Sequence, residues 1–174
     1  MDQTISKKVR ILAVAPTARG FGYCVMENNV MLECGKREAR GNRNVKNAQV
    51  VSKIEKTMNQ FLPDVLVMQD INVARCRRAP RIKALHRQIV GLAEKHKCKV
   101  KLLSGKQLRI TLLGDAKGTK HEMAEMLAQK FPGELGKRLP PKRRAWDSED
   151  GRMDMFDAVG LAVVIQMTAV KNGR

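Results

Sequence analysis

Aromatic residues, paired cysteines and long apolar runs are scarce or missing in this sequence of 174 residues. Only 3% of the residues are aromatic, which argues against a single-strand binder built mainly on base stacking. The four cysteines form no CxxC pair, so a zinc site is not indicated and reduced thiols are expected. No apolar run approaches the roughly 18 residues of a membrane span, and the start of the chain lacks the apolar segment of a secretory signal. We therefore expect a cytoplasmic protein without a membrane partner.

Acidic residues are also few: 17 Asp and Glu stand against 34 Lys and Arg, which gives a formal net charge of +17. A hydrophobic content of 43% excludes a disordered basic tail, because disordered tails contain too few apolar residues to form a core. The length, without internal repeats or a linker, predicts a single domain over residues 1–174. A folded and strongly basic domain points to a negatively charged partner.

The positive charge is grouped in three clusters, and the stretch 71–93 contains no acidic residue at all. Such clusters are what phosphate contacts with counterion release require. The alternative is a well-solvated surface. The clusters are Arg75, Arg77, Arg78, Arg81, Lys83 and Arg87; Lys36, Arg37, Arg40, Arg43 and Lys46; and Lys137, Arg138, Lys142, Arg143 and Arg144.

Hydrophobic periodicity predicts an α/β fold. Three strands open the chain as an antiparallel group, and two later strands alternate with helices, so we expect a mixed sheet of antiparallel and then parallel strands, flanked by helices. His86 and His96 lie on a basic helix and are expected to be solvated, and 131–150 is expected to be a loop. The predicted strands are 10–15, 20–27, 30–36, 64–69 and 98–103, and the predicted helices are 44–61, 81–96, 118–130 and 152–170.

Acidic residues crowd into a short segment near the C-terminus. Asp154 and Asp157 are three residues apart at the start of the last predicted helix, so both carboxylates project from one face. Paired carboxylates suit Mg²⁺ or Mn²⁺, which take oxygen ligands. Acids in the first turn of a solvated helix are the alternative. The segment contains Asp147, Glu149, Asp150, Asp154 and Asp157.

Four motifs, in the expected order, resemble those of RuvC-type Holliday junction resolvases, which have an RNase H-like fold. I-L-A-V-A-P-T-A-R-G-F-G-Y-C-V-M (11–26) resembles the opening hairpin of that family, and P-D-V-L-V-M-Q-D (63–70) resembles its second motif. G-T-K-H-E-M (118–123) is similar to the basic segment that starts a helix, with Lys120 matching its lysine. M-D-M-F-D-A-V-G-L-A (153–162) is similar to the closing helix.

The resemblance implies a homodimeric endonuclease that cleaves branched DNA with two Mg²⁺ or Mn²⁺ ions held by four carboxylates. Carried over to this sequence, the four positions are Ala15, Gln69, Asp154 and Asp157, and the resemblance adds Lys120 to the catalytic centre. Ala15 has no ligand atom and Gln69 offers only a neutral amide oxygen. We therefore expect weak or absent metal binding and impaired cleavage. Asp70 is expected to point to the other face of its strand.

The resulting hypothesis is a resolvase-like protein that binds a four-way junction but cleaves poorly or not at all. The pattern fits equally a site disabled by substitution and a natural relative that only binds DNA. Two alternatives are a non-enzymatic protein that binds DNA or structured RNA, and a different RNase H-like nuclease acting on flaps or hybrids. We expect phosphate contacts from Lys120 and His121, and from Arg75, Arg77, Arg78, Arg81, Lys83, Arg87, Arg43 and Lys46.

Overall fold

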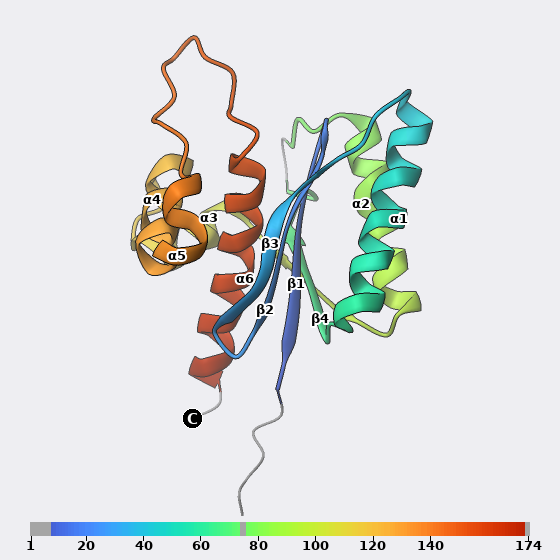
Figure 1. Ribbon diagram of the computed structural model, residues 1–174, viewed down its shortest axis with the longest axis horizontal. Helices are drawn as coiled ribbons and strands as arrows, with labels where there is room; N and C mark the ends of the chain where they lie inside the picture. Colours follow the sequence, from blue (N-terminus) through green and yellow to red (C-terminus); the bar gives the residue numbers. More distant parts are fainter. Residues whose placement is uncertain (1–7, 74–75, 173–174) are drawn as a thin grey trace, which may run out of the picture.

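A five-stranded mixed sheet lies at the centre of the molecule (Figure 1). The structure is a computed structural model that describes residues 8–73 and 76–172, the last three of these by their backbone alone. β1, β2 and β3 are antiparallel, whereas β4 is parallel to both β1 and β5. This confirms the predicted mixed sheet. The strands are β1 (Arg10–Thr17), β2 (Gly20–Glu27), β3 (Val30–Glu38), β4 (Val65–Gln69) and β5 (Lys99–Leu103), in the spatial order β3-β2-β1-β4-β5.

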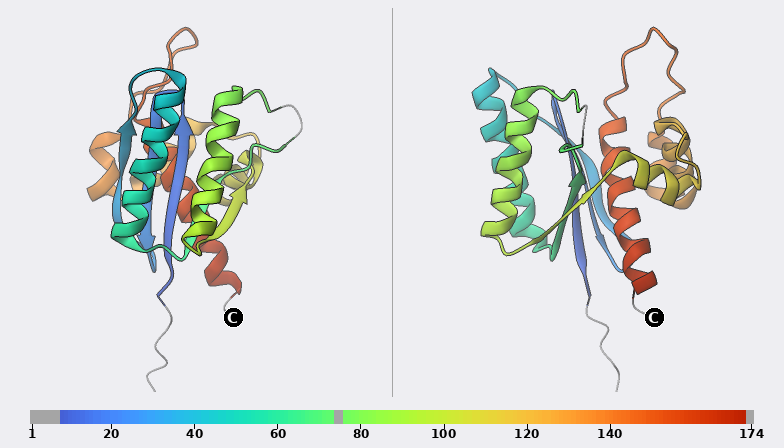
Figure 2. Two further views of the ribbon diagram at one scale, coloured as in Figure 1. Left: turned by 90° about the vertical axis from the view of Figure 1, so that its right-hand side faces the viewer. Right: turned by 180° about the vertical axis from the view of Figure 1, so that it is seen from behind.

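Helices cover both faces of the sheet (Figure 1, Figure 2). α1 and α2 lie side by side on one face, while α6 crosses the other face with α3, α4 and α5 outside it. Among the described helices, none is long and apolar enough to cross a membrane. The helices are α1 (Arg43–Phe61), α2 (Pro80–Lys95), α3 (Gly105–Leu113), α4 (Lys120–Lys130), α5 (Pro132–Leu135), the short 3-10 helix η1 (Gly136–Arg138) and α6 (Met153–Asn172).

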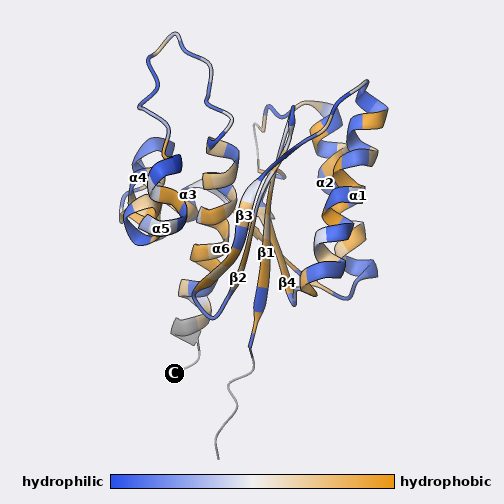
Figure 3. Cartoon of the chain, in the orientation of Figure 1, coloured by the Kyte–Doolittle hydropathy of each residue, from blue (hydrophilic) through white to orange (hydrophobic). Residues whose placement is uncertain are grey.

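Strand alternation divides the core into two layers, one on each face of the sheet. On β1, Ile11 and Ala13 pack toward α6, whereas Leu12 and Val14 pack toward α1 and α2. β1, β4 and α6 are accordingly mostly hydrophobic, and the loop before α6 is mostly hydrophilic (Figure 3). In β1 and β4, the odd-numbered residues therefore face α6 and the even-numbered residues face α1 and α2.

Two segments differ from the prediction, while the other elements lie within two residues of their predicted bounds. Residues 105–113 form α3, which begins with a capping box of Ser104 and Gln107 and ends at Gly114 with φ 71°. α3 buries only Leu108, so its apolar pattern is too weak to predict a helix. The predicted loop 131–150 is helical at its start, in α5 and η1, and is irregular from Leu139 onward.

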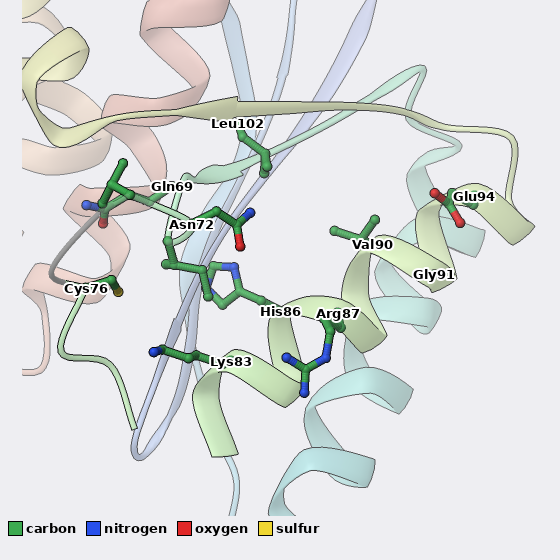
Figure 4. A pocket seen from close by; sticks show the side chains of 12 residues that line it. Gln69, Asn72, Cys76, Lys83, His86, Arg87, Val90, Gly91, Glu94 and Leu102 are labelled. Carbon is green, nitrogen blue, oxygen red and sulfur yellow. The ribbon is translucent and has the colours of Figure 1, made fainter. Parts of the chain in front are cut away.

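His86 is buried, which contradicts the expectation that it is solvated. It is only 5% exposed, because it follows Ile82 by one helical turn and shares the buried stripe of α2. Its ring lines a cavity of about 610 Å³ with Asn72 and Leu102 (Figure 4). Burial lowers the pKa of His86 to about 4, and the positive charge of Arg78 acts in the same direction. The ring of His96 is also largely covered, with Nε2 3.4 Å from Glu55 Oε1.

Acidification is expected to destabilise the protein through His86. The unfolded chain takes up a proton at this residue near pH 6.5, whereas the folded protein resists protonation until about pH 4. The stabilising contribution is complete above about pH 6.5 and is lost as the pH falls to about 4. Urea titrations at about pH 7 and pH 5 measure how much unfolding free energy each protein loses on acidification. The loss in His86→Gln should be smaller than the loss in the parent by about 1–2 kcal/mol. Equal losses in both proteins would contradict this assignment.

Candidate functional site at the carboxyl ends of the strands

Ala15 and Gln69 lie at the carboxyl ends of two adjacent parallel strands. The register of β1 with β4 pairs Ala13 with Val67, and two more residues along each strand set Ala15 level with Gln69. Because side chains alternate, both positions share the α6 face of the sheet. Asp70 has the opposite parity, and its Oδ1 accepts the backbone N–H of Asn72 at 2.9 Å.

The first turn of α6 brings Asp154 and Asp157 to the same strand ends. α6 packs against β2 at Gly22, where a Cβ atom would lie 1.8 Å from the carbonyl oxygen of Asp154. Gly22 pairs with Ala15 in the β1–β2 register, so the missing side chain allows the helix to approach the sheet beside Ala15. Thr17 Oγ1 donates a hydrogen bond to Asp154 Oδ2 at 3.3 Å.

A cavity of about 310 Å³ joins these residues. It lies at the carboxyl ends of the strands, which is where α/β folds generally bind their ligands. The structure brings together in it the five residues predicted for the catalytic centre, Ala15, Gln69, Lys120, Asp154 and Asp157.

Lys120 bridges two carboxylates of this cavity. Thr119 and Glu122 form a capping box that begins α4 and sets Lys120 as its first residue. Lys120 Nζ donates to Glu149 Oε1 at 3.0 Å and to Asp157 Oδ2 at 3.1 Å. Burial lowers the pKa of Lys120, but the charge of Asp157 and the hydrogen bond to Glu149 outweigh this effect, so the pKa is raised. Lys120 is therefore a fixed cation within the cavity.

Burial raises the pKa of both aspartates in the cavity. At Asp154 the hydrogen bond from Thr17 opposes this effect, and the charge of Asp157 adds to it. At Asp157 the charge of Lys120 is the main opposing influence. The two carboxylates are thus partly desolvated, which is typical of functional sites rather than of a solvated helix face.

A second cation, Arg78, engages the side chain of Gln69. Arg78 Nη2 donates to Gln69 Oε1 and Nη1 donates to the carbonyl oxygen of Pro16, both at 3.3 Å. The amide oxygen of Gln69, at a position where the sequence resemblance implies a carboxylate, is therefore already bonded to a guanidinium. Arg109 of α3 also lines the cavity, and its Nε donates to the carbonyl oxygen of Ala116 at 2.8 Å.

The charged residues of this cavity do not fit a pair of divalent metal ions. Two dications require an excess of anionic oxygen ligands, whereas here three carboxylates meet three cationic side chains and the formal charges cancel. Among the described residues, no group of three or more Asp, Glu, His or Cys side chains is placed to hold a metal ion. The six charged residues are Glu149, Asp154, Asp157, Arg78, Arg109 and Lys120.

Further cavities adjoin this one and extend it in two directions. Gln69 is shared with the larger cavity beside α2, which also contains Lys83 and Arg87 (Figure 4). On the other side, Lys120 and Glu149 are shared with a cavity of about 360 Å³ under the loop before α6. A path lined by cationic side chains thus runs from α2 across the strand ends to this loop; its members are Lys83, Arg87, Arg78, Arg109, Lys120, Lys142 and Arg143.

The residues predicted to contact phosphate differ in their exposure and in their bonds within the protein. Arg77 and Arg87 are exposed and Lys83 is half-buried. Arg81 donates to Asn47 Oδ1 at 2.7 Å and to a backbone carbonyl at 3.0 Å, so it ties α2 to α1 and the β1–β2 turn.

The remaining predicted phosphate contacts lie on other elements. Arg43 and Lys46 lie in the first turn of α1, Arg43 being exposed and Lys46 half-buried. His121 Nε2 lies 3.2 Å from Glu125 Oε1 one turn along α4. The prediction for Arg75 falls outside the described residues.

Three residues of the cavity that have polar or charged side chains are not among the sequence-based candidates: Thr17, Arg109 and Glu149. Arg109 belongs to α3, which the capping signal S-x-x-Q at Ser104 and Gln107 could have indicated. Glu149 belongs to the acidic segment, but the sequence assigns it no role of its own. The other acids of that segment are also bonded within the chain, since Asp150 pairs with Arg152 at 2.7 Å and Asp147 Oδ2 accepts the backbone N–H of Arg144.

No protein-family model matches the chain, and no curated protein matches it by sequence. Solved structures do match. RuvC from Thermus thermophilus superposes with a TM-score of 0.70 at 14% identity, covering 94% of this chain and 97% of that one. T. thermophilus RuvC in complex with a Holliday junction substrate has a TM-score of 0.67 at 15% identity, covering 93% and 96%. The yeast mitochondrial Holliday junction resolvase Ydc2 has a TM-score of 0.62 at 17% identity, covering 94% and 82%. The chain therefore has the fold of the RuvC-type Holliday junction resolvases.

Proposed function

We propose that this protein binds branched DNA, specifically a four-way junction, and does not cleave it. The fold is that of T. thermophilus RuvC, one of whose structures is a complex with a Holliday junction. The path of cationic side chains from α2 to the loop before α6 supplies phosphate contacts next to the strand ends. A homodimer is the proposed binding unit, because two identical basic faces related by a two-fold axis match the paired arms of a junction.

One observation carries the proposed lack of cleavage: the central cavity contains as many cations as carboxylates. Lys120 and Arg78 are bonded to Asp157 and Gln69, two of the positions where the resemblance implies metal-ligating acids. A cavity without surplus negative charge offers little attraction to divalent cations, whereas the cationic side chains of the adjoining cavities favour the phosphate backbone. We infer that the site has changed from metal-dependent hydrolysis to DNA binding.

Binding measurements with matched nucleic acids test this function. In about 150 mM salt, where nonspecific attraction is screened, a labelled four-way junction should bind at least about tenfold more tightly than a duplex of the same sequence, a difference of about 1.4 kcal/mol. Sedimentation should give two chains per junction, and no nicking should appear in Mg²⁺ or Mn²⁺. Equal affinity for junction and duplex would refute the junction proposal, and tighter binding of a structured RNA would favour an RNA-binding function.

A further inference from the structure

The loop of residues 139–152, between η1 and α6, projects beyond the end of the molecule at which the strand ends lie (Figure 1). We call it the projecting loop. It carries Trp146, the single tryptophan of the sequence, with 79% of its surface exposed. Leaving an indole ring in water forgoes the large gain that its burial would provide. In a chain with so few aromatic residues, this exposed ring suggests a contact that forms only with a partner.

The neighbouring charges indicate what kind of partner that is. Trp146 follows Lys142, Arg143 and Arg144 in the projecting loop, and the Arg144 guanidinium lies 5.8 Å from the centre of the indole ring. Lys142 and Arg143 line the cavities that adjoin the central one. A flat aromatic ring beside several cations matches a nucleotide, whose base offers a π face and whose phosphate offers negative charge.

The ring is held on an ordered turn. The backbone N–H of Asp147 donates to the carbonyl oxygen of Arg144 at 3.1 Å, and the N–H of Arg144 donates to Asp147 Oδ2 at 3.2 Å. These two bonds close a turn that has Trp146 as its third residue. A second local contact lies at the end of the loop, where Arg152 Nη2 donates to Asp150 Oδ2 at 2.7 Å. Because the turn fixes the backbone that carries the ring, stacking has to order only the side chain of Trp146, which limits its entropic cost.

Trp146 is also close to the central cavity along the chain. Glu149, three residues further on, accepts the hydrogen bond from Lys120 Nζ. Three residues of extended chain span at most about 11 Å. The indole ring is therefore within reach of nucleotides that lie next to the phosphates held at the strand ends.

We propose that Trp146 stacks on a nucleobase that is unstacked at the branch point of the DNA, while Lys142 and Arg143 contact the adjoining phosphates. This inference rests on the proposed junction binding. Bases inside a continuous duplex have both faces covered by their neighbours, so only a base at a branch, a flap or a single-stranded end presents a free face. Trp146 is thus a specificity residue that distinguishes branched from linear DNA.

Fluorescence of the single tryptophan tests the contact directly. When the parent protein is titrated with unlabelled four-way junction, we expect the indole emission to be quenched, and a linear duplex should leave it nearly unchanged. Binding is followed separately by the anisotropy of a labelled junction. Trp146→Ala should weaken junction binding by about tenfold, within the range measured for loss of one stacked base, and leave duplex binding unchanged. Trp146→Phe should restore most of the affinity, because it keeps an aromatic ring.

Leu62→Ala provides the control, since Leu62 is similarly exposed, at 72%, and follows α1 at the opposite end of the sheet. It should bind junctions like the parent. The stacking proposal is overturned if the labelled junction binds without quenching, or if Trp146→Ala retains parental junction affinity. A change in oligomeric state of Trp146→Ala with unchanged junction affinity would identify a protein contact instead and would also overturn the stacking proposal.

If the labelled junction does not bind at all, the proposed function fails. The titration is then repeated with single-stranded DNA, where quenching of the indole emission supports the stacking site and its absence overturns it.

Discussion

Replacing Ala15 with Asp and Gln69 with Glu is expected to convert the chain into a metal-dependent nuclease that nicks four-way junctions. The two positions lie level with each other on adjacent strands and on the face that carries Asp154 and Asp157. The double variant would add two carboxylates to a cavity whose charges now cancel, leaving a surplus that a divalent cation can neutralise. The gain in nicking rate should exceed the roughly 10–100-fold effects of outer-shell ligands, because ligand atoms themselves are introduced.

The structure adds a further step to this experiment. Arg78 donates to Gln69 Oε1, so its guanidinium would compete with a cation for the new carboxylate at this position. Adding Arg78→Ala to the double variant should therefore lower the Mg²⁺ concentration needed for half-maximal nicking. Gln69→Glu alone should recover less activity than the double variant, since position 15 would still lack an oxygen ligand.

Nicking of a labelled junction over a series of Mg²⁺ and Mn²⁺ concentrations measures the effect. Asp157→Asn added to the double variant is the control for the assigned site and should abolish the activity. The site assignment is wrong if the unmodified chain cuts as fast as the double variant. If the double variant binds junctions normally and remains inert, the chain is a long-diverged binding protein rather than a disabled enzyme.

Removing the three cationic side chains of Arg77, Lys83 and Arg87 should weaken binding to every DNA and reduce its salt dependence. Arg77 and Arg87 are exposed and Lys83 lines the cavity beside α2, so all three can contact phosphate. Each phosphate contact contributes about −0.9 to the slope of log K against log salt. The triple Ala variant should therefore have a slope that is shallower by up to about 3. Its melting temperature should be unchanged. Junction and duplex affinities at several salt concentrations measure the slopes.

Two comparisons give this experiment its control. Replacing Lys56, Lys99 and Lys130 with Ala removes the same charge from exposed positions away from the cationic path, and the salt slope should change little. Arg81→Ala should instead lower the melting temperature, because Arg81 is bonded to Asn47 Oδ1. If both triple variants lose equal slope, the net charge rather than a defined face attracts the DNA.

The order and type of most elements follow from local patterns that the sequence displays directly. Alternation in β1 and β4 predicts which side chains share a face, so the parity of the positions is enough to pair Ala15 with Gln69 and to assign Asp70 to the opposite face. The three-residue spacing of Asp154 and Asp157 places both on one side of a helix in the same way. The excess of basic residues is likewise a property of the sequence alone, as is the presence of Ala and Gln at positions 15 and 69, where the resemblance implies carboxylates.

The charge balance of the site could be decided only by the tertiary structure. Lys120 meets Glu149 across 29 positions and Asp157 across 37, and Thr17 reaches Asp154 across 137. No periodic pattern encodes such pairs, because they depend on how the helices dock onto the sheet. The same holds for the guanidinium of Arg78, which a basic cluster predicts only as a phosphate contact but which the fold turns toward Gln69. The local patterns of the sequence predict the scaffold and the residue types at the four positions that the resemblance implies. Packing decides which internal cations lie beside Asp154 and Asp157, since ion pairs depend on distance in space rather than along the chain.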